Sequence, residues 1–278
     1  MKRRCLDRLW IKLIVAGVVW LAFQALVVSS EAQVYTLSDN NSLVQINVGA
    51  PSGMYTWSVD GTNQLDQQWF WFRVGNAAEQ PINTISAPSV TTPNGRTLYT
   101  SYNNGQYGVE VDYMLTGFAP GSGISDIGES IRITNATATA LEFHFFQYAD
   151  FDLAGTATSD VVQLGKNLHG LFNEAFQQKG TEELTETVAT PGANHGEVAF
   201  FSQTLGELND ALATTLNDNA GPVGPGNVTW ALEWDLTIAP GSSVGISKDK
   251  YLIPEPATAT LVALGLVACV LRKRRLSV

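Results

Sequence analysis

The chain has 278 residues, with 16 Lys or Arg, 26 Asp or Glu and a formal net charge of −10 at pH 7. Nine of the cations and three of the anions lie in residues 1–32 and 254–278, which leaves seven cations and 23 anions between them. So acidic a segment excludes nucleic acid and anionic membrane surfaces as natural partners, because phosphate binding needs clustered Lys and Arg.

The amino end, residues 1–32, is predicted to be a secretory signal peptide. A basic segment precedes an apolar run at 13–28, and Ser30 and Ala32 stand at the −3 and −1 positions of a small-residue cleavage site. A retained N-terminal anchor is the alternative interpretation. With either, the rest of the chain is expected to be exported through the inner membrane.

Removing both ends leaves a body of residues 33–253, enough for one large β domain or two small ones. Both cysteines lie outside this body, so thiol catalysis and cysteine-ligated zinc are excluded for it. Asn103-Asn104-Gly105 predicts a hairpin between strands at 97–102 and 107–115. Residues 228–238 alternate between apolar and polar side chains, which is typical of a strand with one buried face.

Other segments complete the expected architecture. Residues 130–135 and 141–148 are predicted to pair as strands, whereas 206–216 and, more weakly, 168–177 have helical spacing of apolar residues. Many short strands with one or two short helices predict an all-β fold, an antiparallel β-sandwich. The aromatic run within 68–74 is interpreted as core packing, with a sugar-stacking platform as the alternative.

Two groups of residues are candidate sites. Asp150 and Asp152 stand at alternate positions before a glycine turn, with Asp160 as a further ligand, and hard carboxylate oxygens in this arrangement suit Ca²⁺. A strand end followed by a solvated turn is the other interpretation. Ca²⁺ is the one cofactor that the sequence suggests.

The three histidines, His144, His169 and His195, are too far apart in sequence to form a local ligand pair. His144 stands among phenylalanines and is expected to be a hydrogen-bonded histidine of the core or of an interface. No nucleophile elbow, Walker loop or dinucleotide fingerprint occurs, so no catalytic residue is predicted.

The carboxyl end, residues 254–278, begins with Pro254, Glu255 and Pro256, which are expected to form an extended strip. An apolar run at 257–271 follows and would span roughly 22 Å as a helix, short of a hydrocarbon core of about 30 Å. A transient membrane helix is therefore predicted, with a buried helix of a soluble domain as the alternative. The chain then presents a cationic group expected to stay cytoplasmic, formed by Arg272, Lys273, Arg274 and Arg275.

This order of Pro-Glu-Pro, apolar run and terminal basic cluster resembles the PEP-CTERM sorting signal, also labelled an ice-binding protein C-terminal domain. The resemblance covers only residues 254–278, although the body also looks like cargo proteins that bear this signal. It implies cleavage near Pro-Glu-Pro by an exosortase, with release of the body to the cell envelope or the extracellular space.

The sequence thus leads to two functional hypotheses. The first is a non-enzymatic matrix or surface protein that associates with exopolysaccharide or biofilm. The second is a secreted polysaccharide-active enzyme or glycan-binding module. Ice binding is a third, weaker interpretation, because the threonines form no regular ladder. Tryptophans lining an open groove beside two carboxylates would favour the enzyme, and tryptophans buried between sheets would favour the matrix protein.

Overall fold

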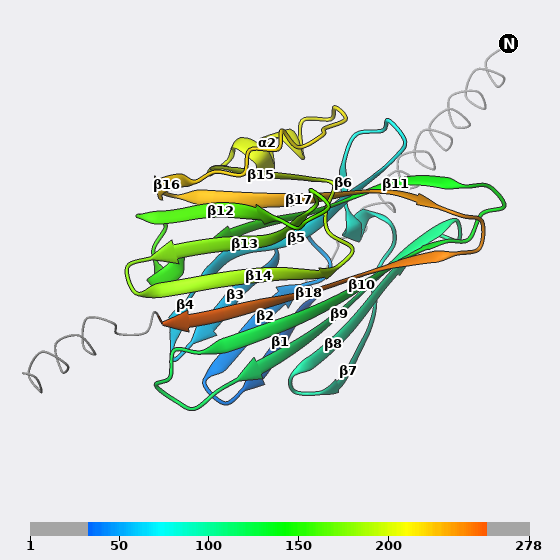
Figure 1. Cartoon of the computed structure of the whole chain (residues 1–278). Helices are drawn as coiled ribbons and strands as arrows, with labels where there is room; N and C mark the ends of the chain where they lie inside the picture. The colour runs from blue at the N-terminus through cyan, green and yellow to red at the C-terminus, as the bar shows by residue number, and fades with distance from the viewer. Residues whose placement is uncertain (1–32, 255–278) are drawn as a thin grey trace, which may run out of the picture. The chain divides into compact units, whose positions relative to one another are not determined.

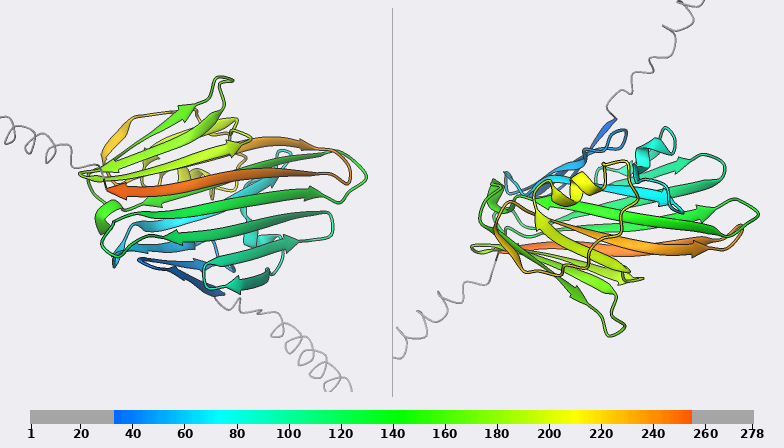
Figure 2. Two further views of the ribbon diagram at one scale, coloured as in Figure 1. Left: turned by 60° about the horizontal axis from the view of Figure 1, so that its bottom comes forward. Right: turned by 90° about the horizontal axis from the view of Figure 1, so that it is seen from above.

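The computed structural model describes residues 33–254, which form two facing β-sheets of nine strands each (Figures 1 and 2). We call them sheet A and sheet B. Sheet A has the order β1-β2-β3-β5-β11-β17-β15, with β4 beside β3 and β6 beside β5. Its strands are β1 (Val34–Asp39), β2 (Ser42–Asn47), β3 (Gly53–Val59), β4 (Thr62–Asn63), β5 (Leu65–Val74), β6 (Gln80–Pro81), β11 (Leu141–Phe151), β15 (His195–Phe200) and β17 (Val228–Ile238).

Sheet B has the order β16-β12-β13-β14-β18-β10-β9-β8-β7. Its strands are β7 (Ser89–Asn94), β8 (Thr97–Asn103), β9 (Tyr107–Gly117), β10 (Ser125–Asn135), β12 (Asp160–Lys166), β13 (Phe172–Lys179), β14 (Glu182–Thr190), β16 (Val223–Gly226) and β18 (Ser243–Pro254). The ladders are antiparallel except for a short parallel contact between β3 and β5. The predicted antiparallel sandwich is therefore confirmed for the body.

The space between the sheets is filled by aromatic side chains. Phe70 of β5 stacks on Phe145 of β11 with ring centroids 5.4 Å apart, and Phe151 stacks on Trp230 at 6.2 Å. These residues occupy alternate positions of their strands, and a strand points alternate side chains to the same face. The period-two pattern of β17 thus places Trp230 and Trp234 in the core, both less than 2% exposed.

The core also contains four charged residues. The side chains of Glu129, Glu186, Lys248 and Lys250 have no exposure to solvent. Lys250 Nζ lies 2.8 Å from Glu129 Oε2 and 3.2 Å from Glu186 Oε2, and Lys248 Nζ also contacts Glu129. Gln147 Nε2 donates a hydrogen bond to Glu186 Oε2 at 2.9 Å. We call these four charged residues the core quartet.

Three expectations about local structure are wrong. The helix expected at 206–216 is limited to α2 (Gln203–Glu207), since Ala211 has a positive φ of 65°. The weaker helix at 168–177 is largely strand β13. The strands at 130–135 and 141–148 exist but do not pair, because β10 belongs to sheet B and β11 to sheet A.

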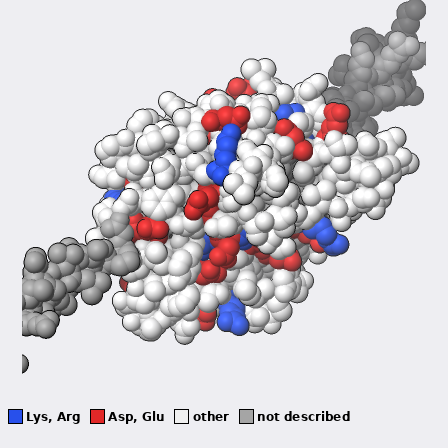
Figure 3. Space-filling view, in the orientation of Figure 1, with Lys and Arg blue, Asp and Glu red and all other residues white. Residues whose placement is uncertain are grey.

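The remaining regular elements are the short 3₁₀ turns η1 (Ile82–Thr84) and η2 (Leu153–Gly155). Between Gln33 and Pro254, no helix has both the length and the apolar character needed to cross a membrane. Figure 3 shows acidic side chains at several separate places on the face drawn, with basic side chains interspersed among them. The excess of anions is a property of the body's sequence as a whole.

Candidate functional site

The outer face of sheet A carries a cluster of imidazoles and carboxylates from three neighbouring strands. In the β11–β17 ladder His144 stands opposite Asp235, and in the β15–β17 ladder His195 stands opposite Glu233. Residues directly opposite in an antiparallel pair project from the same face. The fold thus brings two histidines that are far apart in the sequence beside a pair of carboxylates on β17. We call His144, His195, Glu233 and Asp235 the histidine–carboxylate cluster.

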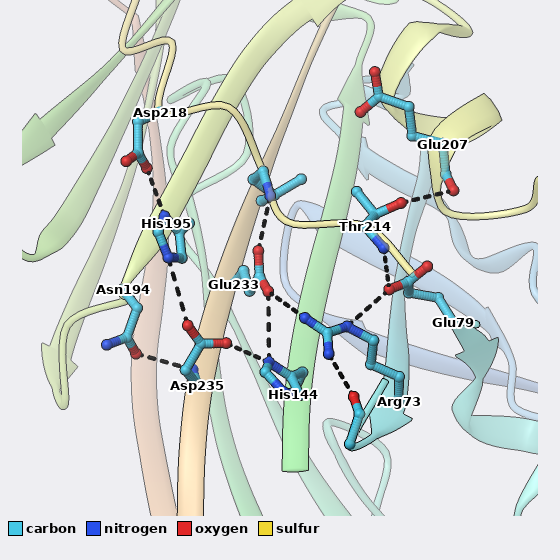
Figure 4. Close-up of polar contacts among 12 residues, drawn as sticks. Arg73, Glu79, His144, Asn194, His195, Glu207, Thr214, Asp218, Glu233 and Asp235 are labelled. Atoms are coloured by element: carbon cyan, nitrogen blue, oxygen red, sulfur yellow. Dashed lines mark hydrogen bonds and ion pairs between the residues drawn. The ribbon is translucent and has the colours of Figure 1, made fainter. Parts of the chain in front are cut away.

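Asp235 lies between the two imidazoles of the cluster (Figure 4). Its Oδ1 contacts His144 Nδ1, and its Oδ2 lies 3.5 Å from His195 Nε2. The other ring nitrogen of His195, Nδ1, lies 3.1 Å from Asp218 Oδ1. His144 Nδ1 is also 3.7 Å from Glu233 Oε1. Imidazole and carboxylate groups therefore alternate along a continuous row.

Arg73 extends this row into the interior. Its Nη2 lies 3.4 Å from Glu233 Oε1, and its Nε lies 3.0 Å from Glu79 Oε1. The segment after α2 covers these groups: the Leu216 N–H donates to Glu233 Oε2 at 2.8 Å, and the Thr214 N–H donates to Glu79 at 2.9 Å. Glu233 is consequently fully buried, whereas the side chains of His144, His195 and Asp235 are 20%, 30% and 34% exposed.

Electrostatics in the cluster follow from this burial. Loss of solvation raises the pKa of Glu233 to about 8, and the charge of Asp235 adds to the rise. The Leu216 N–H and the Arg73 guanidinium oppose it. Groups of this kind can exchange protons near neutral pH or hold a metal ion.

A second feature, on the outer face of sheet B, is a hollow of about 350 Å³. Tyr99 and Met114, which line it, are 43% and 50% exposed. Asp112, Ser130 and Asp249 add polar groups to the same lining. We call this feature the sheet B hollow.

The sheet B hollow is deepest at Gly128, which has no side chain and stands opposite Asp249 in the β10–β18 ladder. Two residues before it on β10 is Asp126. Burial raises the pKa of Asp126 to about 7, and the charge of Asp249 and a hydrogen bond between the two carboxyls add to the rise. The hollow thus has a carboxyl pair at its edge that holds a proton near neutral pH.

The residues predicted to bind Ca²⁺ lie close enough to influence one another. Burial raises the pKa of Asp150 to about 8, and the charges of Asp152, Asp66 and Asp160 raise it further. Asp160 is paired with Lys179, whose Nζ lies 3.3 Å from Asp160 Oδ2. The structure therefore gathers the three predicted ligands with one cation beside them, and the Ca²⁺ site stays a prediction.

The other predicted site residues concern export. Pro254 is the last residue of β18, extended and exposed, and is paired with Glu182. Glu255 and Pro256 fall outside the described residues, as do the cleavage-site pair and the terminal cations, which are Ser30, Ala32, Arg272, Lys273, Arg274 and Arg275.

The aromatic run in β5 is core, as the sequence suggests: Trp69, Phe70 and Trp71 are at most 1% exposed. No tryptophan of this run is available as a sugar-stacking platform. Of the two tyrosines that line the sheet B hollow, Tyr99 is exposed and Tyr113 is buried.

Sequence reasoning missed the histidine–carboxylate cluster. His144 does have hydrogen-bonding partners, as expected, but they are carboxylates on an outer sheet face, whereas His169 lies elsewhere in an exposed turn. One signal was present: Glu233 and Asp235 occupy the polar face of the alternating strand β17. The identity of the neighbouring strands, which supply the histidines, was not visible.

No known family's sequence profile matches the chain, and no curated protein matches it in sequence. Similar folds occur among solved structures. A bacterial glucoamylase complexed with acarbose has a TM-score of 0.57 at 9% identity, over 87% of this chain and 36% of its own. A putative aldose 1-epimerase from Escherichia coli K12 has a TM-score of 0.55 at 11% identity, over 81% of this chain and 100% of its own.

A galactose mutarotase-like protein from Lactobacillus casei ATCC 334 has a TM-score of 0.50 at 10% identity, over 79% of this chain and 99% of its own. The present chain spans about a third of the glucoamylase and nearly all of the other two. At these identities the likeness concerns the fold. The body therefore has a two-sheet fold similar to that of these three carbohydrate-active or mutarotase-like proteins.

Proposed function

We propose that the body is an exported glycan-binding domain whose ligand binds in the sheet B hollow. The observation that carries this proposal is the lining of the hollow, where exposed Tyr99 and Met114 stand beside the carboxylates of Asp112 and Asp249. A sugar ring has an apolar face that packs on such side chains and hydroxyls that donate to carboxylates.

Size and fold support the same ligand class. Small-molecule sites commonly measure about 300–1,000 Å³, so the hollow suits one or two sugar residues of a longer chain. The similar structures include one described as a glucoamylase with bound acarbose and one as an aldose 1-epimerase. The acidic lining favours a neutral or cationic glycan over a sulfated one.

The test is binding of the exported protein to a panel of exopolysaccharides, with co-sedimentation and reducing-end release measured in the same samples. Tyr99→Ala and Asp249→Asn are each expected to weaken binding about tenfold, the loss of one good contact worth about 1.4 kcal/mol. Phe201→Ala, which removes an aromatic side chain that is 45% exposed outside the hollow, is the matched control.

Equal binding by all four proteins would contradict the site, and no binding by the unaltered protein would contradict the function. Release of reducing ends would favour the polysaccharide-active enzyme over the binding module. The burial of Trp69 and Trp71 argues against the enzyme, because β5 does not form the groove lined by tryptophans that the enzyme is expected to have.

Delivery by the PEP-CTERM tail is part of the proposal and depends on the sequence resemblance. An exosortase would cleave near Pro254, and the body would then join the exopolysaccharide matrix. Mass spectrometry of the mature carboxyl terminus in hosts with and without the exosortase tests this step. An intact tail in the exported protein would contradict it while leaving glycan binding unaffected.

A further inference from the structure

We propose that the histidine–carboxylate cluster on sheet A is a binding site for a divalent transition-metal ion such as Zn²⁺. One ligand atom from each of His144, Glu233 and Asp235 lies within 4.8 Å of the other two. Ligand atoms at about 2.1 Å from a tetrahedral metal are themselves about 3.4 Å apart. Small side-chain rotations would therefore bring the three atoms to coordination distance.

The contacts of His144 show why a cation fits. Its Nδ1 faces Asp235 Oδ1 and also Glu233 Oε1, the latter at 3.7 Å. A ring nitrogen carries at most one hydrogen, which can serve only one of these two oxygens well. A metal ion bound to the nitrogen and both carboxylates satisfies all three groups.

His195 supports the site from the side of Asp235. Its Nδ1 is 3.1 Å from Asp218 Oδ1 and its Nε2 is 3.5 Å from Asp235 Oδ2, so the imidazole bridges two carboxylates. It lies outside the group of three ligand atoms, and its place beside Asp235 is that of an outer partner that orients a ligand carboxylate.

The surrounding charges match a divalent cation. Glu79, Asp218, Glu233 and Asp235 give four formal negative charges, and Arg73 gives one positive charge, so the formal balance is −3 (Figure 4). Arg73 is shared between Glu79 and Glu233, which limits its effect on the metal position. It also holds Glu233 in place together with the Leu216 N–H.

The donor set indicates the class of metal. Imidazole nitrogen with carboxylate oxygen suits Zn²⁺, Mn²⁺ or Fe²⁺, whereas Ca²⁺ prefers oxygen ligands alone. The partial exposure of His144, His195 and Asp235 would leave a coordination position open to solvent. The site lies on a different sheet from the sheet B hollow, so it is independent of glycan binding.

Zn²⁺ binding to the chelator-treated exported protein, measured by calorimetry, tests the proposal, with Co²⁺ absorption as a second readout. One ion per chain is expected. His144→Ala and Asp235→Asn are expected to lower the affinity more than a hundredfold. Asp218→Asn, which removes the second carboxylate contact of His195, is expected to lower it about tenfold. Excess Ca²⁺ should not displace Zn²⁺.

His169→Ala is the matched control, since it removes an exposed imidazole outside the cluster. Thermal unfolding verifies that each variant is folded. If a ligand variant does not fold, His195→Ala is measured in its place, since that side chain is 30% exposed. Absence of stoichiometric binding by the unaltered protein would overturn the proposal. So would a loss of affinity in the cluster variants no larger than that in His169→Ala.

Discussion

Among single residues, the four members of the core quartet stand out because each is charged and fully buried. Burial alone would raise the pKa of Glu129, but the ammonium groups of Lys248 and Lys250 outweigh it and lower that pKa. Burial lowers the pKa of Lys248 to about 8. The quartet is balanced as a whole, so removing one member leaves an uncompensated charge between the sheets.

Lys250→Met should therefore destabilise the body by about 3–5 kcal/mol, the usual cost of breaking a buried ion pair. The double variant with Glu129→Leu and Lys250→Met should be less destabilised, because it removes opposite charges that lie 2.8 Å apart. Urea unfolding measures both. Costs that simply add in the double variant would contradict the coupling.

Ca²⁺ binding at Asp150, Asp152 and Asp160 is a second prediction at this scale. Asp150 and Asp160 are each 1% exposed, and Oδ1 of Asp150 and of Asp152 has no hydrogen-bond partner among the described residues. Ca²⁺ at a hundred times its Kd would contribute about 2.7 kcal/mol. That corresponds to a rise in Tm of about 5–10 °C for a chain of this size.

Asp150→Asn should abolish this rise, and His144→Ala, in the separate cluster, should not. Thermal unfolding with and without Ca²⁺ distinguishes the two sites. A rise that survives in Asp150→Asn would show that Ca²⁺ binds elsewhere or unspecifically.

At the scale of elements, the sequence predicts a strand or hairpin well where the signal is local. Asn103-Asn104-Gly105 does connect β8 and β9, and the alternating pattern of 228–238 coincides with β17. The sequence does not predict which sheet a strand joins: β10 and β11 are consecutive in the chain but belong to different sheets. Apolar spacing also misleads at 206–216, where Leu208 and Leu216 are buried by an irregular segment and Leu212 is 68% exposed.

The β10–β18 pair makes stability depend on pH. Asp126 has a pKa of about 7 in the folded chain against 3.8 for an unperturbed carboxyl, so between these values the folded state holds a proton that the unfolded state has lost. The free energy of unfolding should therefore fall as the pH rises from about 4 to about 7. Denaturant unfolding across this range measures the effect. The free energy of unfolding should fall less in Asp126→Asn than in the unaltered protein, and equally in the exposed control Glu142→Gln.

The contact between β1 and β9 joins the two sheets, and we expect it to be sensitive to substitution. A Cβ on Gly117 would lie 1.8 Å from the Asp39 carbonyl oxygen, and the Gly117 N–H donates to Asp39 Oδ2 at 3.0 Å. Gly117→Ala should thus cost about 1–3 kcal/mol or more through overpacking. Gly95→Ala, where a Cβ meets nothing within 4 Å, is the control, and equal Tm values would contradict the expectation.

For the whole molecule, composition and pattern are enough to predict an acidic antiparallel sandwich whose body lacks cysteine. They are not enough to predict either candidate site. His144 and Asp235 are 91 positions apart, and the hollow is formed by strands β8, β9, β10, β14 and β18. Such sites depend on long-range strand order, which a single sequence encodes only through the fold as a whole.

The position of β18 has a consequence for the timing of biogenesis. This strand is the last of the described body, yet it lies in the middle of sheet B, between β14 and β10, and it supplies both lysines of the quartet. During synthesis from the amino end, the two halves of that sheet remain unjoined until residue 254 has been made. Completion of sheet B is therefore a late step of folding, and a chain truncated before residue 243 should not reach the folded state.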